Sequence, residues 1–268
     1  MQQASTSAFY DAGRAWINAN ARALHLIPVN ARTFHTQKIA NGLAVHPTLG
    51  MALATNPVTG HVVHVADSFS VLKTDRTSFA IVDNTILEQP LVPKCNVTIT
   101  PYVARDFDGI PLNQLSLKDR KEAPNARMFG MRRPSIPVKP TTAYMEILIE
   151  QLNALPMPDK MRCVSVALVD AGARKETLQL VEERSTRTYS LSMSVSTAKH
   201  QGTVCIGYDE KFDLYWIELT DLKQQLVKRF DDVYFDVLPE VLEDNVTDTA
   251  CLLAKVQLQQ GGRAAKAA

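Results

Sequence analysis

The chain has 268 residues, of which 46% are hydrophobic and 21% are charged, and this composition excludes a wholly disordered protein. Its 29 Lys and Arg balance 28 Asp and Glu, so a globally basic nucleic-acid binder is excluded and any such function must depend on local charge. The length allows one or two domains, each large enough to bury a core.

The cysteines and the N-terminus indicate a cytoplasmic protein. The four cysteines are far apart and form no CxxC pair, which disfavours a zinc ribbon and favours reduced, buried thiols. The first residues have no cationic start and no long apolar run, so no signal peptide is predicted. No stretch approaches the roughly 20 apolar residues that span a bilayer, so no membrane insertion is expected.

Residues 1–106 are predicted to form a helix followed by a small β domain. Apolar residues recur at helical spacing from Ser7 to Leu24, which predicts an amphipathic helix. From Gly60 onward, polar turns separate short β-prone runs at 62–65, 69–72, 79–82 and 97–99. This pattern predicts a small antiparallel, barrel-like domain, because so short a sheet curls to protect its edges.

Residues 107–140 are predicted to be a basic linker, because prolines interrupt them and they show little periodicity. Six of their cations are candidate contacts to nucleic acid or to a protein partner: Lys118, Arg120, Lys121, Arg127, Arg132 and Arg133. Only Phe129 offers an aromatic ring for stacking on bases, so a simple solvated linker competes with this interpretation.

A second domain is predicted over residues 141–268, and it begins with helices. Apolar residues share one helical face from Tyr144 through Ile147 and Leu148 to Leu155, and Pro156 ends that helix. A second helix is predicted over 162–171, with Gly172 as its C-terminal glycine. The β-tolerant run at 163–166 leaves a strand there as the alternative.

The second half of this domain reads as an antiparallel sheet. Tyr189, Leu191, Met193 and Val195 alternate with four serines, which predicts a strand with one packed face and one wet face. Runs at 204–208 and 214–219 follow polar turns and complete a three-strand meander. A strand near 226–230, a helix near 233–244 and a last strand at 251–258 are expected to complete an α+β domain with two or three packing helices.

Common catalytic and cofactor motifs are absent from the sequence. It contains no glycine-rich phosphate loop, no HExxH and no GxSxG, and nothing in it predicts a cofactor. The segment 106–109 has the acidic start of a calcium loop but lacks the distal glutamate, so we interpret it as a turn. His61 and His64 are three apart on a predicted strand and are expected to point to opposite faces, which disfavours a metal site.

Cys205 and His200 flank the same predicted hairpin and are the one candidate pair for a nucleophile and its base. A core thiol between Val204 and Ile206 is the competing interpretation of Cys205. Whether the protein is an enzyme therefore stays open, with the sequence favouring a non-enzyme.

Carboxylates dominate the chain between Asp231 and Asp248, where no basic residue occurs. Four of them share one face of the predicted helix: Asp236, Glu240, Glu243 and Asp244. Like charges at this spacing repel mildly, so the face is a candidate contact for a cationic partner, including the chain's own basic linker. A solvated helix face is the alternative.

Residues 60–102 resemble the small β domain named after the KfrB protein of broad-host-range conjugative plasmids. The likeness rests on Gly60-His61-Val62-Val63-His64-Val65, Asp67, Phe69-Ser70-Val71-Leu72-Lys73, Phe79-Ala80-Ile81-Val82-Asp83, Leu87, Pro90, Val97-Thr98-Ile99 and Tyr102. Lys94-Cys95 stands where the family has a glycine before the closing strand. Pieces of the second domain, at 157–159, 169–171 and 206–209, resemble uncharacterised plasmid-borne proteins.

This resemblance implies a context of mobile elements and no catalytic residue. The leading hypothesis is a non-enzymatic accessory protein that binds a protein partner in plasmid maintenance, conjugative transfer or interference with a competing plasmid, known as fertility inhibition. The alternative is a nucleic-acid-binding module, with DNA held by the small barrel and the basic linker. A hydrolase with dispersed carboxylates or a Cys–His site is the third. The oligomeric state stays open.

Overall fold

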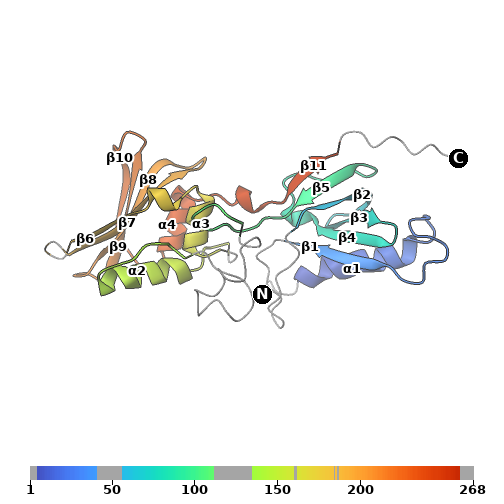
Figure 1. Ribbon diagram of the computed structural model, residues 1–268, viewed down its shortest axis with the longest axis horizontal. Helices are drawn as coiled ribbons and strands as arrows, with labels where there is room; N and C mark the ends of the chain where they lie inside the picture. The colour runs from blue at the N-terminus through green and yellow to red at the C-terminus, as the bar shows by residue number, and fades with distance from the viewer. Residues whose placement is uncertain are drawn as a thin grey trace. The chain divides into compact units, whose positions relative to one another are not determined.

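The computed structural model of the protein describes residues 5–40, 56–111, 135–159, 162–183, 185 and 187–259 (Figure 1). The chain divides into two units, described separately below. Unit 1 contains residues 1–103 and 252–268, and unit 2 contains residues 104–251. Each unit combines a mainly antiparallel sheet with one or more helices, so the predicted α+β class is confirmed.

Unit 1 is built on a six-stranded sheet in the order β1-β4-β3-β2-β5-β11. Its elements are α1 (Ser5–Asn20), β1 (His35–Ile39), β2 (Val58–Val65), β3 (Phe69–Asp75), β4 (Ser78–Asp83), a 3-10 turn (Asn84–Ile86), β5 (Asn96–Thr100) and β11 (Lys255–Leu258). The strands pair antiparallel except β1, which runs parallel to β4. The sheet ends at β1 and β11, which do not pair, so the barrel is not closed and that part of the prediction is wrong.

The central strands of unit 1 are covered on both faces, which explains why β3 and β4 are nearly continuous apolar runs. On one face, Phe9 and Ile17 of α1 pack in a cluster with Phe79 of β4, and Figure 1 shows α1 alongside this part of the sheet. On the other face, Leu72 belongs to a second cluster that the 84–95 connection closes through Leu87. The predicted amphipathic helix is therefore confirmed.

A β-bulge in β2 changes which side chains share a face. Two residues of β2, Val63 and His64, stand against a single residue of β3, Val71. The extra residue offsets the alternation, so His61 and His64 lie on the same face of the sheet. The prediction that these histidines point to opposite faces is wrong, because strict period-2 alternation ignores the bulge.

Unit 2 is a five-stranded antiparallel meander in the order β10-β9-β8-β7-β6, packed against helices. Its elements are α2 (Ala143–Ala154), α3 (Val164–Asp170), a 3-10 turn (Lys175–Thr177), β6 (Gln179–Glu183), β7 (Thr188–Ser196), β8 (Gln201–Asp209), β9 (Leu214–Asp221), β10 (Leu226–Val233) and α4 (Leu238–Asn245). The predicted three-strand meander, the further strand near 226–230 and the expected two or three packing helices are confirmed, and the segment after Cys163 is a helix. β6 is an additional strand that the sequence pattern does not predict.

The core of unit 2 lies between one face of the meander and its helices. Leu148 of α2, Leu168 of α3 and Leu242 of α4 join Leu191 and Ile206 of the sheet in one cluster. The apolar set of β7 is buried in it, as the alternation predicts. Of the four serines on the opposite face, Ser194 and Ser196 are exposed, Ser192 is half-buried and Ser190 is buried, so the predicted wet face is present only in the second half of the strand.

The buried face of α2 differs in part from the predicted one. Thr142 caps the helix by accepting a hydrogen bond from the Met145 backbone N–H. Leu148, Leu152 and Leu155 of the predicted face are buried, as expected. Tyr144 is 37% exposed and Ile147 is 50% exposed, and Met145 and Ile149 are buried in their place. The sequence carries two overlapping apolar stripes about one residue apart, and packing against the sheet selects the second.

Two segments belong to a different part of the protein from the one predicted from the sequence. The predicted C-terminal strand is present, but it pairs with β5 of unit 1, where Val256 and Ala254 join the apolar cluster. Phe107 and Ile136, at opposite ends of the predicted linker, are buried in the core of unit 2. Between them, residues 112–134 lie outside the described residues.

Candidate functional site

The predicted contact residues fall into two groups. The six linker cations predicted to be contacts lie within 112–134, outside the described residues. Of the acidic set, Glu240, Glu243 and Asp244 lie on α4, and Asp236 precedes the helix by two residues. The predicted helical face of four carboxylates therefore has three, and Asp236 lies in the connection before the helix. The reason is that β10 extends to Val233 and α4 starts only beside Pro239.

The acidic residues on α4 are mostly in solvent. Glu240 and Asp244 are exposed and Glu243 is half-buried. The Glu243 backbone carbonyl accepts a hydrogen bond from Lys199 Nζ, so a cation already lies at the C-terminal end of this helix, where the helix dipole is negative. The N-terminal end, with Asp236 and Glu240, is where the carboxylates meet exposed aromatic rings.

A row of five aromatic side chains crosses one end of the unit 2 sheet. We call it the aromatic row: Tyr144, Tyr189, Tyr208, Tyr215 and Phe235. The meander register pairs Tyr189 with Tyr208 and Tyr208 with Tyr215, which places all three on the face that carries the helices. Ring centroids lie 5.2 Å apart for Tyr144–Tyr189, 5.4 Å for Tyr208–Tyr215 and 6.4 Å for Tyr215–Phe235.

The hydroxyl groups of the row are anchored by polar partners. The Tyr208 hydroxyl donates to Asp213 Oδ1 at 2.7 Å, and the Tyr215 hydroxyl donates to Gln151 Oε1. Burial and the Asp213 carboxylate raise the pKa of Tyr208. A hydrogen bond with Glu210 raises the pKa of Tyr144. The rings therefore stay neutral near pH 7.

The row is buried in its middle and open at its ends. Tyr189 and Tyr215 are each 4% exposed, whereas Phe235 is 42% exposed and the neighbouring Tyr234 is 64% exposed. Exposed aromatic rings beside carboxylates suit a cationic side chain, which gains both cation–π and ion-pair contacts. Tyrosine is also enriched in protein interfaces. The sequence analysis missed this row because it depends on the pairing register of three strands.

The candidate Cys–His pair is not assembled. Cys205 pairs with Ser192 and Glu218 on the serine face of the sheet, so the prediction of a core thiol between Val204 and Ile206 is wrong. The alternation of β8 places Cys205 on the opposite face from its neighbours. His200 is buried in the preceding turn, with Nε2 3.4 Å from the Thr203 carbonyl oxygen. Burial raises the pKa of the Cys205 thiol, which disfavours a thiolate nucleophile.

The two histidines on β2 have separate partners although they share a face. His61 Nδ1 lies 2.9 Å from Asn96 Oδ1. The His64 ring stacks on Trp16 of α1 with centroids 4.3 Å apart, and burial lowers the pKa of His64. In the described part of the chain, no group of three or more His, Cys, Asp or Glu side chains is arranged to hold a metal ion.

A buried charge cluster lies behind α3. The Arg162 side chain is fully buried, with Nε 2.8 Å from Asp159 and Nη1 3.0 Å from Asp170. Its Nη1 also lies 3.3 Å from the Cys251 sulfur. Burial, opposed in part by Arg162, raises the pKa of Cys251 to about 11, so this thiol is protonated at neutral pH. The cluster connects three segments of unit 2, and we interpret its role as structural.

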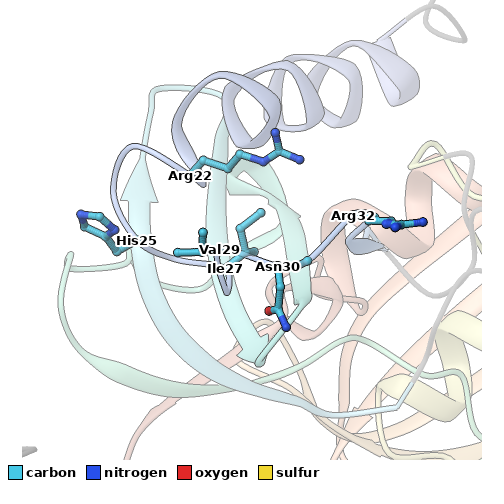
Figure 2. A pocket seen from close by; sticks show the side chains of 7 residues that line it. Arg22, His25, Ile27, Val29, Asn30 and Arg32 are labelled. Atoms are coloured by element: carbon cyan, nitrogen blue, oxygen red, sulfur yellow. The ribbon is translucent and has the colours of Figure 1, made fainter.

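A hollow of about 330 Å³ lies at the connection from α1 to β1 (Figure 2). Arg22, His25, Asn30 and Arg32 are among the residues that line it. Figure 2 shows His25 pointing away on the opposite side of the connection from Arg32, while Arg22 extends from the end of the helix. The basic groups do not point toward one common position, so the hollow is not arranged to bind an anionic ligand.

No helix in the described ranges is long and apolar enough to cross a membrane. Comparison of the chain with protein-family models, with curated proteins and with solved structures finds no match.

Proposed function

We propose that this chain is a non-enzymatic accessory protein that binds a basic segment of another protein on the aromatic row and the adjacent carboxylates. The observation that carries this proposal is the exposure of Tyr144 and Phe235 at the two ends of the row, together with Asp236, which follows Phe235 in the chain, and Glu240 in the first turn of α4. Lysine or arginine side chains of the partner would lie over the rings and pair with the carboxylates.

The part of unit 2 that follows residue 134 has a negative net charge, which favours a cationic partner. From the sequence, residues 135–251 hold twelve Lys and Arg against nineteen Asp and Glu, a formal net charge of −7. Near the row, Arg187 is 3.8 Å from Glu210, and this loose pair is readily displaced by a partner's cation. An acidic, aromatic surface of this kind binds basic segments and repels nucleic acid.

The biological setting is proposed from the resemblance of residues 60–102 to the KfrB domain. That family implies a partner in plasmid maintenance or conjugative transfer, or a target in fertility inhibition of a competing plasmid. The basic residues of 112–134 enter this proposal as a second contact. Arg132→Glu with Arg133→Glu is therefore expected to weaken an effect on plasmid transfer.

The test is affinity capture from nuclease-treated cells that carry a conjugative plasmid, followed by mass spectrometry. The wild-type chain is expected to retain a plasmid-encoded protein. Tyr144→Ser combined with Phe235→Ser is expected to reduce that capture at least tenfold, because two exposed rings are lost, each worth about 1 kcal/mol or more. Neutralising Asp236→Asn and Glu240→Gln is expected to remove most of the salt dependence of capture.

The matched control carries Leu222→Ser and Leu226→Ser. Both side chains are exposed and apolar, and they lie at the β9–β10 turn, at the opposite end of β9 from Tyr215. The control is expected to retain the partner. Equal loss in the control and in the aromatic variant, or capture that depends on nucleic acid, would contradict the proposal.

The hydrolase alternative has less support. It needs Cys205 and His200 to meet, and each has other neighbours in the structure. Cys205→Ala is therefore expected to leave the activity of the protein in a transfer assay unchanged.

A further inference from the structure

The two units carry opposite net charge. Unit 1 has ten Lys and Arg against five Asp and Glu, a formal net charge of +5. Unit 2 has nineteen against twenty-three, a formal net charge of −4, and the two values sum to the +1 of the whole chain. The net charge of the whole chain, close to zero, thus conceals a basic unit. A basic unit can attract a polyanion, provided that unit 1 has a surface that can bind one.

In unit 1, α1 covers only part of one sheet face. The helix packs on β3 and β4, where Val71, Phe79 and Ile81 form the cluster with Phe9 and Ile17. Val63 and His64 of β2 also lie against this cluster, and beyond them the same face continues with polar side chains over the end of β3, the start of β2, β5 and β11. The register places eight polar side chains on this open area: Thr59, His61, Lys73, Asn96, Thr98, Thr100, Lys255 and Gln257. We call it the polar sheet surface.

None of these eight residues is acidic, which is unusual for a solvated sheet face, where lysine and glutamate commonly alternate across strands. Thr59, His61, Asn96, Lys255 and Gln257 are exposed, and the other three are half-buried. Asp75 pairs with Ser78, on the opposite face from Phe79, so this carboxylate of β3 lies on the other side of the sheet.

Hydrogen bonds across the strands hold this surface in place. The hydroxyls of Thr59 and Thr98 are 2.7 Å apart, and Gln259 Nε2 donates to Thr98 Oγ1 at 2.7 Å. His61 Nδ1 lies 2.9 Å from Asn96 Oδ1; with that oxygen as acceptor, Nδ1 carries the proton and the Asn96 amide keeps its N–H groups available. Across the described residues, neither Lys73 nor Lys255 has a carboxylate within ion-pair distance.

We propose that the polar sheet surface binds the phosphate backbone of nucleic acid. It presents lysine ammonium groups, amide N–H groups and hydroxyls, the side chains that contact phosphate and sugar oxygens, and no carboxylate to repel them. It carries no Phe, Tyr or Trp ring for base stacking, and the His61 imidazole is held by Asn96, so binding is expected to be independent of sequence. It also carries no exposed apolar side chain to enter a lipid interface, which favours nucleic acid over an anionic membrane.

The experiment uses the full chain and fluorescently labelled 20-nucleotide DNA, single-stranded and duplex, with anisotropy measured over a range of salt concentrations. The wild type is expected to bind with an affinity that falls as salt rises. Lys73→Glu combined with Lys255→Glu is expected to weaken binding at least tenfold at low salt. It is also expected to reduce the log–log salt slope by about two, since each phosphate contact contributes about 0.7 to 0.9.

The matched control is Lys175→Glu with Lys223→Glu, two exposed lysines of unit 2 that change the net charge of the chain by the same amount. Circular dichroism and thermal unfolding verify that both double variants are folded. The control is expected to bind DNA within about twofold of the wild type.

Three results would overturn the proposal. One is the absence of DNA binding at low salt. Another is equal weakening in the two double variants, which would assign binding to net charge or to the basic residues of 112–134. The third is binding to vesicles containing phosphatidylserine that the Lys73→Glu, Lys255→Glu variant loses while DNA does not bind, which would make the surface a membrane contact.

Discussion

Arg162 shows how a single residue can hold unit 2 together. Its side chain has no exposed area, and the carboxylates of Asp159 and Asp170 flank it at hydrogen-bond distance. Burial alone lowers the pKa of a guanidinium, but the Asp159 hydrogen bond and the nearby charges outweigh it, so the pKa of Arg162 is raised. Its Nη2 has no hydrogen-bond partner in the described residues, so the cluster is stabilised by charge rather than by complete pairing.

Removing this charge leaves two carboxylates in a buried site. Arg162→Ala is therefore expected to lower the free energy of unfolding by about 3 to 5 kcal/mol, measured by urea denaturation. The control is Arg187→Ala, since Arg187 is 64% exposed and 3.8 Å from Glu210, and a change below about 1 kcal/mol is expected there. Similar values for the two variants would show that the Arg162 cluster contributes no more than a surface pair.

Among the elements, the strand pair β8–β9 places a large ring on a glycine. On the serine face of the sheet, Gly207 pairs with Trp216, and a Cβ built on Gly207 would lie 2.0 Å from the indole ring. The Arg229 guanidinium lies over the Trp216 ring, 5.2 Å from its centroid, and also pairs with Glu218. The glycine thus lets the ring lie flat against the backbone.

Gly207→Ala is expected to push the ring off the sheet, because neither strand backbone can move by that distance. In a Trp16→Phe background, which leaves Trp216 as the one tryptophan, its fluorescence is expected to shift to the red as the indole enters water. A stability loss of about 1 to 3 kcal/mol is expected for the overpacking. Ser192→Ala on the same face is the control, and an unshifted spectrum in Gly207→Ala would show that the ring does not rest on the glycine.

Elements that depend on a short stretch of sequence are predicted from the sequence, whereas features that depend on the pairing of strands are not. The helix at 143–154 and the meander strands are recoverable because their apolar periods and turn residues lie within short windows. The β2 bulge, the parallel β1 and the aromatic row are not, because each depends on how a strand pairs with its neighbour, and the pattern within one strand does not determine that register. The acidic residues of α4 were found by composition alone, whereas the aromatic rings beside them required the register.

At the scale of the whole molecule, the chain leaves unit 1 after Val103 and returns to it at Leu252. Unit 2 is in effect inserted between β5 and β11, two strands that pair with each other. A hydrophobic run at the C-terminus predicts a strand but not the sheet that the strand joins. The sequence pattern therefore predicts that the strand belongs to the domain that is nearer in sequence. The insertion also explains how a basic and an acidic unit coexist in one chain and supports separate partners for each.

This connectivity makes unit 1 depend on the C-terminus. A stop after Cys251 removes β11 with its Val256, removes Ala254 just before the strand, and exposes the edge of β5. Unit 1 is expected to lose about 3 to 6 kcal/mol of stability, because two or more side chains leave its core, while unit 2 keeps its own.

Hydrogen exchange read by mass spectrometry separates the two units. Protection is expected to fall in β2 and β5 and to persist in β7 and β8, which lie in the core of unit 2. The control is a stop after Gln259, which keeps β11 and its backbone hydrogen bond from Gln259 N–H to the Asn96 carbonyl. If the shorter chain kept full protection in β5, the pairing of β5 with β11 would contribute nothing to unit 1. If it lost protection in both units, the two would unfold together as one cooperative body rather than as a domain with another inserted in it.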